Sequence, residues 1–559
     1  MDTSAIQRRR WIILGVLVVG LLAIVIDNTV LNVALKTIAS PVGGLGASQS
    51  QLEWAINSYT LVFAGLLFTF GVIGDRIGRK RVLMVGLALF GLGSLLSAYS
   101  HSPDQLIWAR AAMGLGGAAV MPQTLSIIAN VFQPQERARA IGIWTSAVGI
   151  GVAIGPVLGG LLLTHFWWGS VFLINVPVTI AGAVAALILV PESRNPSPGR
   201  IDYLGVLASV LGLVLVVFGV VQGGDGVSWL SAGVLGPLLG GLAVLALFVW
   251  WESRIEHPSL DVRLFKNRTL AASVSSIALL FFGMGGVYFF TSFYLQNVRG
   301  YSPLEAGALA VPFALAQFLI APRSAPLVER FGVRAVAVAG MLLNAIAIAG
   351  YAFIGTSSPI WIVGVLYFIQ GAGLGVAIPA ATASIMQALP RERAGAGSAL
   401  SNTARQVAVA LSVAVLGSIL AQAYRSSLSP TLTRLPAGAR NAAGTSITAT
   451  QALAQHLGPA GRFLLAPADA SFVDAMRITT AIAAGLAVVG AIAVSRWMPG
   501  KPRPTIEEIE EIVAREIAAA ERDLALIARP RPSEEENSTT SYLERTGASP
   551  GTAGESLDG

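Results

Sequence analysis

Cysteine is absent from this sequence, and charged residues make up only 12% of its 559 positions. The missing cysteines exclude disulfide bonds and thiolate metal sites without identifying a compartment. A soluble domain carries roughly 25% charged residues, so this composition is typical of a membrane protein with many spans. The sequence contains no HExxH and no GxxxxGK[ST] segment, which argues against a membrane enzyme and against an ATP-driven pump.

Apolar residues reach 54% and are arranged in runs long enough to cross a hydrocarbon layer, which requires about 20 residues per helix. We therefore predict an all-α integral membrane protein. Fourteen spans are expected, near 11–35, 52–74, 81–100, 104–128, 138–163, 169–190, 201–221, 232–251, 270–294, 304–322, 335–354, 360–383, 398–421 and 476–497. Arg8, Arg9 and Arg10 precede the first run as in a signal peptide, but the run is too long for one and favours a retained helix.

The net charge of +7 comes without a basic stripe interleaved with aromatic residues, so no nucleic-acid partner is expected. Instead, the basic residues gather in alternate connections between the spans. They are Arg76, Arg79, Lys80, Arg81, Arg137, Arg139, Arg194, Arg200, Arg254, Arg263, Lys266, Arg268, Arg330, Arg334, Arg391 and Arg393. Because short basic loops stay in the cytoplasm, this asymmetry predicts a multi-pass protein of the plasma membrane with both termini cytoplasmic.

Two distant segments repeat one pattern. MGLGGAAVMP at 113–122 and QGAGLGVAIP at 370–379 share two glycines and a proline at the same spacing, and PQERA at 134–138 is echoed by PRERA at 390–394. A weaker echo links GVIGDRIGRKR at 71–81 with APLVERFGVR at 325–334. Two similar halves around a central site are typical of secondary transporters, in which one half rocks against the other.

The repeat predicts a domain order along the chain. We expect a cytoplasmic N-terminus, a six-helix bundle, two extra helices, a second six-helix bundle with a long, partly ordered extracellular loop, and a cytoplasmic tail with an amphipathic helix and a disordered end. The corresponding ranges are 1–10, 11–190, 201–251, 270–497 with its loop at 422–475, and 498–559 with its helix at 505–528.

Asp27 interrupts an otherwise apolar run in the first span, and Asn28 and Asn32 follow it. A carboxylate in hydrocarbon costs several kcal/mol, so burial favours its proton-bound form and makes Asp27 a candidate proton site. Arg110 in the fourth span cannot lose its charge and needs an anion or a carbonyl group nearby. We expect these two side chains to pair and to couple proton binding to movement; a structural polar anchor is the alternative for Asp27, and a helix-locking hydrogen bond for Arg110.

These residues resemble a known family. GVIGDRIGRKR is similar to the cytoplasmic signature loop of the major facilitator superfamily, Arg110 with Gly114 to its fourth-span motif, and GVAIGPVLGG at 151–160 to the fifth-span motif of its antiporters. The first span, together with Trp54 and Tyr59, resembles the drug:proton antiporter branch with fourteen spans. The resemblance covers residues 10–498, although Lys36 replaces a proline of the family pattern.

The resemblance implies roles for two further groups. It implies a gating loop that acts as a charge lock, formed by Gly71, Asp75, Arg76, Gly78 and Arg79. It also implies an antiporter motif in a kinked, small-residue helix, formed by Gly151, Gly155, Pro156, Gly159 and Gly160. A basic stop-transfer turn and plain close packing are the respective alternatives.

Other polar and aromatic residues are candidates for the cavity, although structural roles are also open to them. They are Asn28, Asn32, Trp54, Tyr59, Gln123, Phe289, Phe293, Gln317 and Gln370. We predict a monomeric, proton-coupled exporter of drugs, antibiotics or other amphipathic small molecules, with protons as the coupling ion and no cofactor. A solute importer or symporter and a lipid exporter of the same fold are alternatives, and a membrane enzyme is a remote one.

Overall fold

A computed structural model describes residues 3–194, 202–224, 227–255, 258, 260–389, 394–433, 435–436, 439–440, 443–498 and 517. Its contacts divide the chain into two units, Met1–Lys501 and Pro502–Gly559. Only the first is described here, and the predicted helix at 505–528 and the end of the tail lie outside the described residues apart from Ile517. Every regular element within the described ranges is helical.

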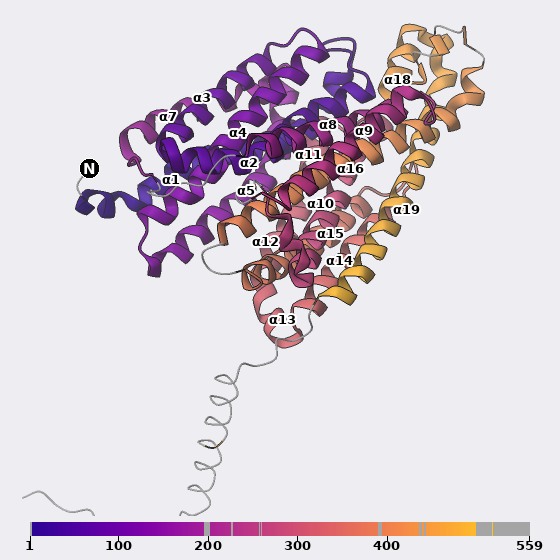
Figure 1. The fold of residues 1–559 in the computed structure, drawn as a ribbon. Coiled ribbons are helices and arrows are strands. Elements are labelled where there is room, and N and C mark those ends of the chain that lie inside the picture. The colour runs from indigo at the N-terminus through magenta and orange to yellow at the C-terminus, as the bar shows by residue number, and fades with distance from the viewer. Residues whose placement is uncertain are drawn as a thin grey trace, which may run out of the picture. The chain divides into compact units, whose positions relative to one another are not determined.

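The first group of helices covers the N-terminal third of the chain and is drawn in indigo and purple in Figure 1. It comprises α1 (Thr3–Ala39), α2 (Gln49–Ile77), α3 (Arg79–Ala98), α4 (Pro103–Val131), α5 (Pro134–His165), α6 (Ser170–Leu173) and α7 (Asn175–Leu189). Ser48 begins α2 with a capping box and the Ser102 side chain caps α4, as expected for residues that satisfy the first free N–H groups of a helix. We call α1 to α7 the N-half.

The second group follows a pair of extra helices, α8 (Tyr203–Gly224) and α9 (Ala232–Glu252), of which α8 packs against α2 and α16. We call this second group the C-half. It comprises η1 (Val262–Lys266), α10 (Arg268–Phe293), the π-helix η2 (Tyr294–Val298), α11 (Pro303–Ala308), α12 (Val311–Ile320), η3 (Ala321–Arg323), α13 (Ser324–Phe331), α14 (Val333–Tyr351), α15 (Trp361–Gln387), α16 (Ala394–Leu432), α18 (Ile447–His456), η5 (Gly458–Leu464) and α19 (Leu465–Trp497).

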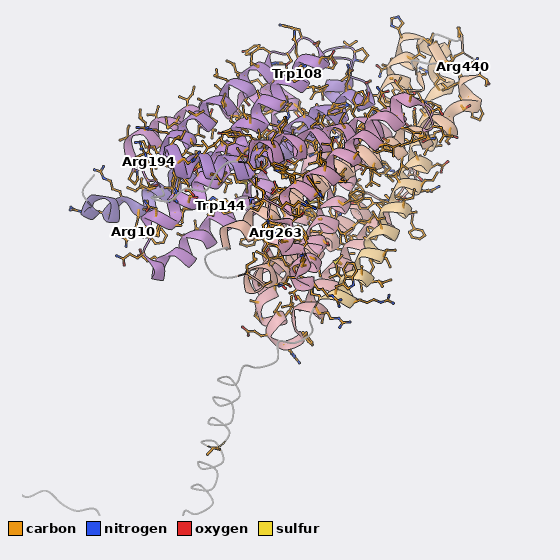
Figure 2. All side chains as sticks on the ribbon, in the orientation of Figure 1. Arg10, Trp108, Trp144, Arg194, Arg263 and Arg440 are labelled. Carbon is orange, nitrogen blue, oxygen red and sulfur yellow. The ribbon has the colours of Figure 1, made fainter. Side chains whose placement is uncertain are left out.

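Large apolar side chains project outward from these helices, as Figure 2 shows for Trp108 on α4, which is 77% exposed. Such a surface is suited to lipid rather than to water. Twelve helices within the described residues are long and apolar enough to span a membrane, or thirteen if α2, bent by 52° between Leu67 and Thr69, counts as one span. The predicted count of fourteen is therefore not confirmed. The expected span at 138–163 lies in α5, where only the shorter apolar helix Ile150–His165 is found.

The two halves repeat the same helix packing. Gly114 on α4 faces the backbone of Tyr59 on α2, and Gly371 on α15 faces the backbone of Phe313 on α12, with no room for a side chain at either position. In the same way, Gly116 and Gly373 approach α3 and α14. The glycines of the sequence repeat thus lie at points where corresponding helices pack closely.

The long connection predicted as a partly ordered loop at 422–475 is largely helical where it is described. α16 continues to Leu432, α18 and η5 follow, and α19 begins at Leu465. The many alanines of this segment favour helix, and Tyr424 anchors it with a 2.7 Å hydrogen bond to Thr450 and an edge contact with the Phe472 ring.

Candidate functional site: a buried ion pair between α1 and α4

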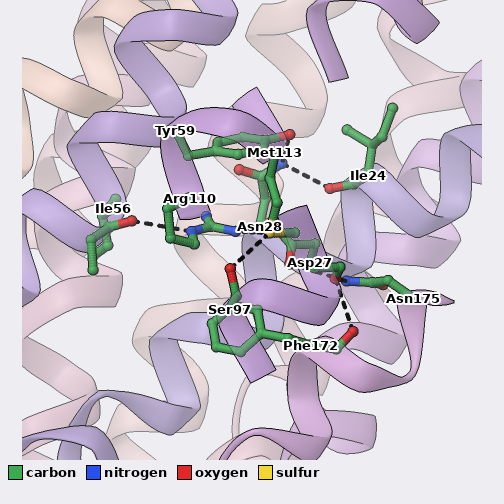
Figure 3. A network of polar contacts seen from close by, with 12 residues as sticks. Ile24, Asp27, Asn28, Ile56, Tyr59, Ser97, Arg110, Met113, Phe172 and Asn175 are labelled. Atoms are coloured by element: carbon green, nitrogen blue, oxygen red, sulfur yellow. Dashed lines mark hydrogen bonds and ion pairs between the residues drawn. The ribbon is translucent and has the colours of Figure 1, made fainter. Parts of the chain in front are cut away.

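The N-half encloses an ion pair in its interior. The Arg110 guanidinium on α4 donates to Asp27 Oδ2 on α1, and the two residues are 1% and 2% exposed, respectively. Figure 3 shows the pair among its neighbours. The structure thus brings together the two residues that the sequence singled out as a carboxylate and a permanent cation within apolar helices.

A polar shell orients the Asp27 carboxylate. Asn175 on α7 donates to Asp27 Oδ1 at 3.1 Å, and its amide also lies 3.1 Å from Ser94 Oγ on α3, which donates to the Phe172 carbonyl at 2.9 Å. Arg110 and Asn175 therefore each contact one carboxylate oxygen, while Ser94 and the Phe172 carbonyl hold Asn175 in place. The sequence reasoning overlooked Asn175 and Ser94, although a polar residue within an apolar run was the signal that identified Asp27.

Arg110 is held from other directions as well. Its Nε donates to the Ala55 carbonyl on α2 at 3.1 Å, and its guanidinium lies 4.4 Å from the centre of the Tyr59 ring. A cation over an aromatic face is attracted to the electron-rich ring. Both groups come from α2, so the position of that helix is coupled directly to the ion pair.

Asn28 and Asn32 continue the polar stripe of α1 toward its C-terminal end. Asn28 Nδ2 donates to the Tyr59 hydroxyl at 3.1 Å and to the Ile24 carbonyl at 2.8 Å, and Asn32 Nδ2 donates to the Asn28 carbonyl at 3.2 Å. Ser292 on α10 donates to the Asn32 carbonyl. The stripe therefore runs from the ion pair to the contact between the halves.

A small cavity lies at this contact. It has a volume of about 20 Å³, which is enough for roughly one water molecule. Its lining residues come from both halves and are Thr29, Asn32, Val33, Pro156, Tyr288, Ser292, Leu295, Ala306, Ala310 and Tyr367. Asn32 and Pro156 are the predicted site residues among them.

The C-half wall of this cavity leads into a buried cluster of tyrosines. The Tyr367 ring centre lies 5.4 Å from that of Tyr288 and 6.1 Å from that of Tyr351. Within the part of the chain that the structure describes, the hydroxyls of Tyr288 and Tyr351 have no hydrogen-bond partner. The cluster is thus aromatic, uncharged and incompletely hydrogen bonded.

Three other predicted cavity residues are buried in the C-half. Gln370 donates to Asn344 Oδ1 at 3.3 Å, and the rings of Phe289 and Phe293 meet edge to face at 5.5 Å. All three pack inside the half rather than around the ion pair.

The remaining predicted cavity residues lie apart from both groups. Trp54 stacks obliquely on Phe218 of α8 at 6.2 Å, Gln123 donates to the Phe70 carbonyl of α2 at 2.7 Å, and Gln317 is partly buried on α12. Gln123 thereby supports the bent segment of α2. The nine predicted cavity residues are therefore dispersed over several environments in this conformation.

The predicted gating loop joins α2 to α3 through Gly78, whose φ of 124° is one that side-chain-bearing residues rarely adopt. Asp75 pairs with Arg79 at 2.8 Å, whereas Arg76 is exposed. Glu192, beyond α7, accepts from the Lys80 backbone N–H at 3.2 Å. The polar contacts found for this loop within the described residues stay inside the N-half.

The predicted antiporter motif lies on two faces of α5. Gly151, Gly155 and Gly159 face α1, with Gly155 against Thr29. Gly160 faces the backbone of Leu304 on α11, while the Pro156 backbone lies against Gly307, so this side of α5 meets the C-half. The motif therefore packs α5 closely both within its own half and across to the other.

No group of three or more His, Cys, Asp or Glu side chains suited to a metal occurs among the residues that are described. A buried carboxylate beside a guanidinium, as in the pair of Asp27 and Arg110, is able to bind a proton in competition with the positive charge.

Comparisons with known proteins agree with this architecture. The chain is 34% identical to the multidrug efflux pump LfrA of Mycolicibacterium smegmatis, over 88% of this chain and 97% of that protein. It is also 34% identical to the methyl viologen resistance protein SmvA of Salmonella typhimurium, over 88% and 98%.

Among solved structures, a bacterial homologue of the human lysosomal transporter Spinster, in an inward-facing, unoccupied conformation, shares the fold. Its TM-score is 0.60 at 20% identity, with 88% of this chain and 99% of that chain covered. The sequence pattern of one family matches residues 17–413. On these grounds the chain belongs to the Major Facilitator Superfamily and is a multi-pass membrane protein.

Proposed function

We propose that this protein is a proton-coupled exporter of drugs, antibiotics or other amphipathic small molecules, acting across the plasma membrane by alternating access. The full-length similarity to efflux and resistance proteins supports export. The observation that carries proton coupling is the buried pair of Asp27 and Arg110. Ionisable side chains inside a membrane are rare and mark ion or substrate pathways.

In this proposal the proton competes with Arg110 for Asp27. When Asp27 is charged, the ion pair binds α1 to α4, and Arg110 holds α2 through the Ala55 carbonyl and the Tyr59 ring. Protonation of Asp27 neutralises the carboxylate and weakens this link. Because α2 also packs against α16 of the C-half, a change at the pair can reach the interface between the halves.

The halves are bonded where the C-terminal end of α1 meets η2, the π-helix that follows α10. Lys36 donates to the Gln296 carbonyl, and Gln296 Nε2 donates to the Val33 carbonyl at 2.9 Å. With both termini in the cytoplasm, these bonds close the extracellular side. The gating loop at 71–81 would then secure the opposite conformation, and the glycine face of α5 would limit leakage between the halves.

The driving force is adequate for such a cycle. One pH unit supplies about 1.4 kcal/mol per proton, and a membrane potential of 100 mV adds about 2.3 kcal/mol per charge. Together they support a gradient of roughly a few hundredfold for a neutral solute when one proton is exchanged. We propose that a monomer suffices, with α8 and α9 as two helices added between the six-helix bundles.

The test is dye transport in inside-out vesicles. An imposed pH gradient should drive dye accumulation, and dye addition should in turn dissipate the gradient. Asp27→Asn should abolish both effects because the variant cannot exchange a proton. Asp474→Asn is the matched control, since Asp474 forms an exposed pair with Arg477 on α19. Normal uphill transport by Asp27→Asn would refute the proposed proton site.

A further inference from the structure

Three cations on helices long and apolar enough to span the membrane differ in their partners. Arg110 has the Asp27 carboxylate and the Ala55 carbonyl, and Lys36 has the Gln296 carbonyl. Arg405 on α16 has neither kind of partner among the residues that the structure describes. A cation within the membrane normally pairs with an acidic side chain or a backbone carbonyl, so Arg405 requires another explanation.

The surroundings of Arg405 leave its charge uncompensated. Its Nη2 donates to the amide oxygen of Asn402 at 2.7 Å, which aligns the guanidinium but supplies no negative charge. The Phe281 ring of α10 lies beneath it, with 5.3 Å between the guanidinium carbon and the ring centre. Arg405 is also partly exposed, so the side chain remains accessible.

Arg405 lies on α16, the helix of the C-half that packs against α2 of the N-half. On α2, the Tyr59 ring lies against Arg110, and the Tyr59 hydroxyl accepts a hydrogen bond from Asn28. The two arginines that adjoin this pair of helices thus differ, because Arg110 is paired with an acid and Arg405 has none among the described residues. A cationic molecule entering here would be repelled by Arg405, whereas an anionic oxygen would supply the missing counter-charge.

We propose that Arg405 binds a carboxylate or phenolate oxygen of the transported molecule, while Phe281 offers a flat surface to its aromatic ring. The preferred substrates are then aromatic weak acids. This inference rests on the proposed export function for its biological meaning, but the binding site itself can be tested without transport. It assigns substrate recognition to the C-half and leaves proton binding to the N-half.

The first test measures binding to the purified full-length protein in a non-ionic detergent without anionic lipid. Fluorescein, an anion, and rhodamine 123, a cation, share the xanthene ring system and differ in charge. The wild type should bind fluorescein more tightly. Arg405→Gln should raise the Kd for fluorescein about tenfold or more, because it removes a charge-assisted hydrogen bond, and should leave rhodamine 123 unchanged or bound more tightly.

Three further variants make this test specific. Arg405→Lys keeps the charge and should retain most of the fluorescein affinity, whereas Phe281→Leu should weaken fluorescein several-fold while the charge remains. Arg477→Gln is the matched control, since it removes an exposed arginine of α19, and should alter neither dye. Tighter binding of rhodamine 123 by the wild type, or equal losses of both dyes in Arg405→Gln, would overturn the inference.

A second test separates this inference from the proposed function. A pH gradient is imposed on inside-out vesicles, and the uptake of each dye is compared between the wild type and Arg405→Gln. Arg405-dependent fluorescein binding without any gradient-driven uptake would remove the export function and leave the binding site standing. Gradient-driven uptake of fluorescein with the same KM in both proteins would refute the Arg405 binding site and leave the export function standing.

Discussion

The two halves share their backbone packing but differ in the chemistry that this packing presents to the interior. Arg110 stands four residues before Gly114, and Tyr367 stands four residues before Gly371, so the two occupy equivalent positions of the repeat. In the N-half that position pairs with a buried acid; in the C-half it joins a cluster of tyrosines. The two halves keep these close helix contacts while their interior side chains differ, and our proposals assign proton binding to the N-half and substrate binding to the C-half.

The largest expected effect comes from erasing this difference. Arg110→Tyr places tyrosine at both equivalent positions and leaves Asp27 buried without its charge partner. Removing one member of a buried ion pair costs about 3–5 kcal/mol, so the unfolding temperature in detergent should fall markedly and vesicle transport should be lost. Adding Asp27→Asn should restore part of the stability but no transport. A stable, active Arg110→Tyr protein would contradict the assignment of proton binding to the N-half.

The shared packing can be tested at the repeated glycines. Gly114→Ala and Gly371→Ala each push a methyl group into the backbone of a neighbouring helix. Overpacking of this kind costs about 1–3 kcal/mol, and the two losses should be similar because the contacts are equivalent. Gly485→Ala on α19 meets nothing within 4 Å, so its unfolding temperature should not fall. A loss at only one of the repeated glycines would show that the halves pack differently.

The fold and its repeat could be predicted from apolar runs and glycine spacing, since both follow from the thickness of the bilayer and from close helix contact. The pairing of Asp27 with Arg110 followed from the cost of leaving either charge alone. Trp54 and Gln123 show the limit: polarity indicates that a side chain faces inward, but it does not specify which neighbour it meets. Asn175 was missed because an uncharged amide in an apolar run has no such obligatory partner.

A smaller effect is expected where the halves meet. Lys36→Met removes the bond to the Gln296 carbonyl but keeps the apolar stem of the side chain. For a partly exposed charge, a loss of about 1 kcal/mol shifts the population toward an open extracellular side by about fivefold. Because the chain has no cysteine, spin labels can be attached at Val42→Cys and Phe353→Cys, two exposed positions. The distance between the labels should lengthen in Lys36→Met and stay unchanged in Lys36→Arg.

The smallest expected effect comes from removing one buried tyrosine hydroxyl in each half. The Tyr59 hydroxyl accepts a hydrogen bond from Asn28, whereas that of Tyr288 has no partner among the described residues. Tyr59→Phe should therefore lower the stability by about 1 kcal/mol, while Tyr288→Phe should leave it unchanged or raise it, since an unpaired buried hydroxyl is unfavourable. Unfolding temperatures of the two variants, measured in the same detergent, test this difference. Equal losses would mean that a bound water satisfies the Tyr288 hydroxyl, and the two hydroxyls would then be equally well hydrogen bonded.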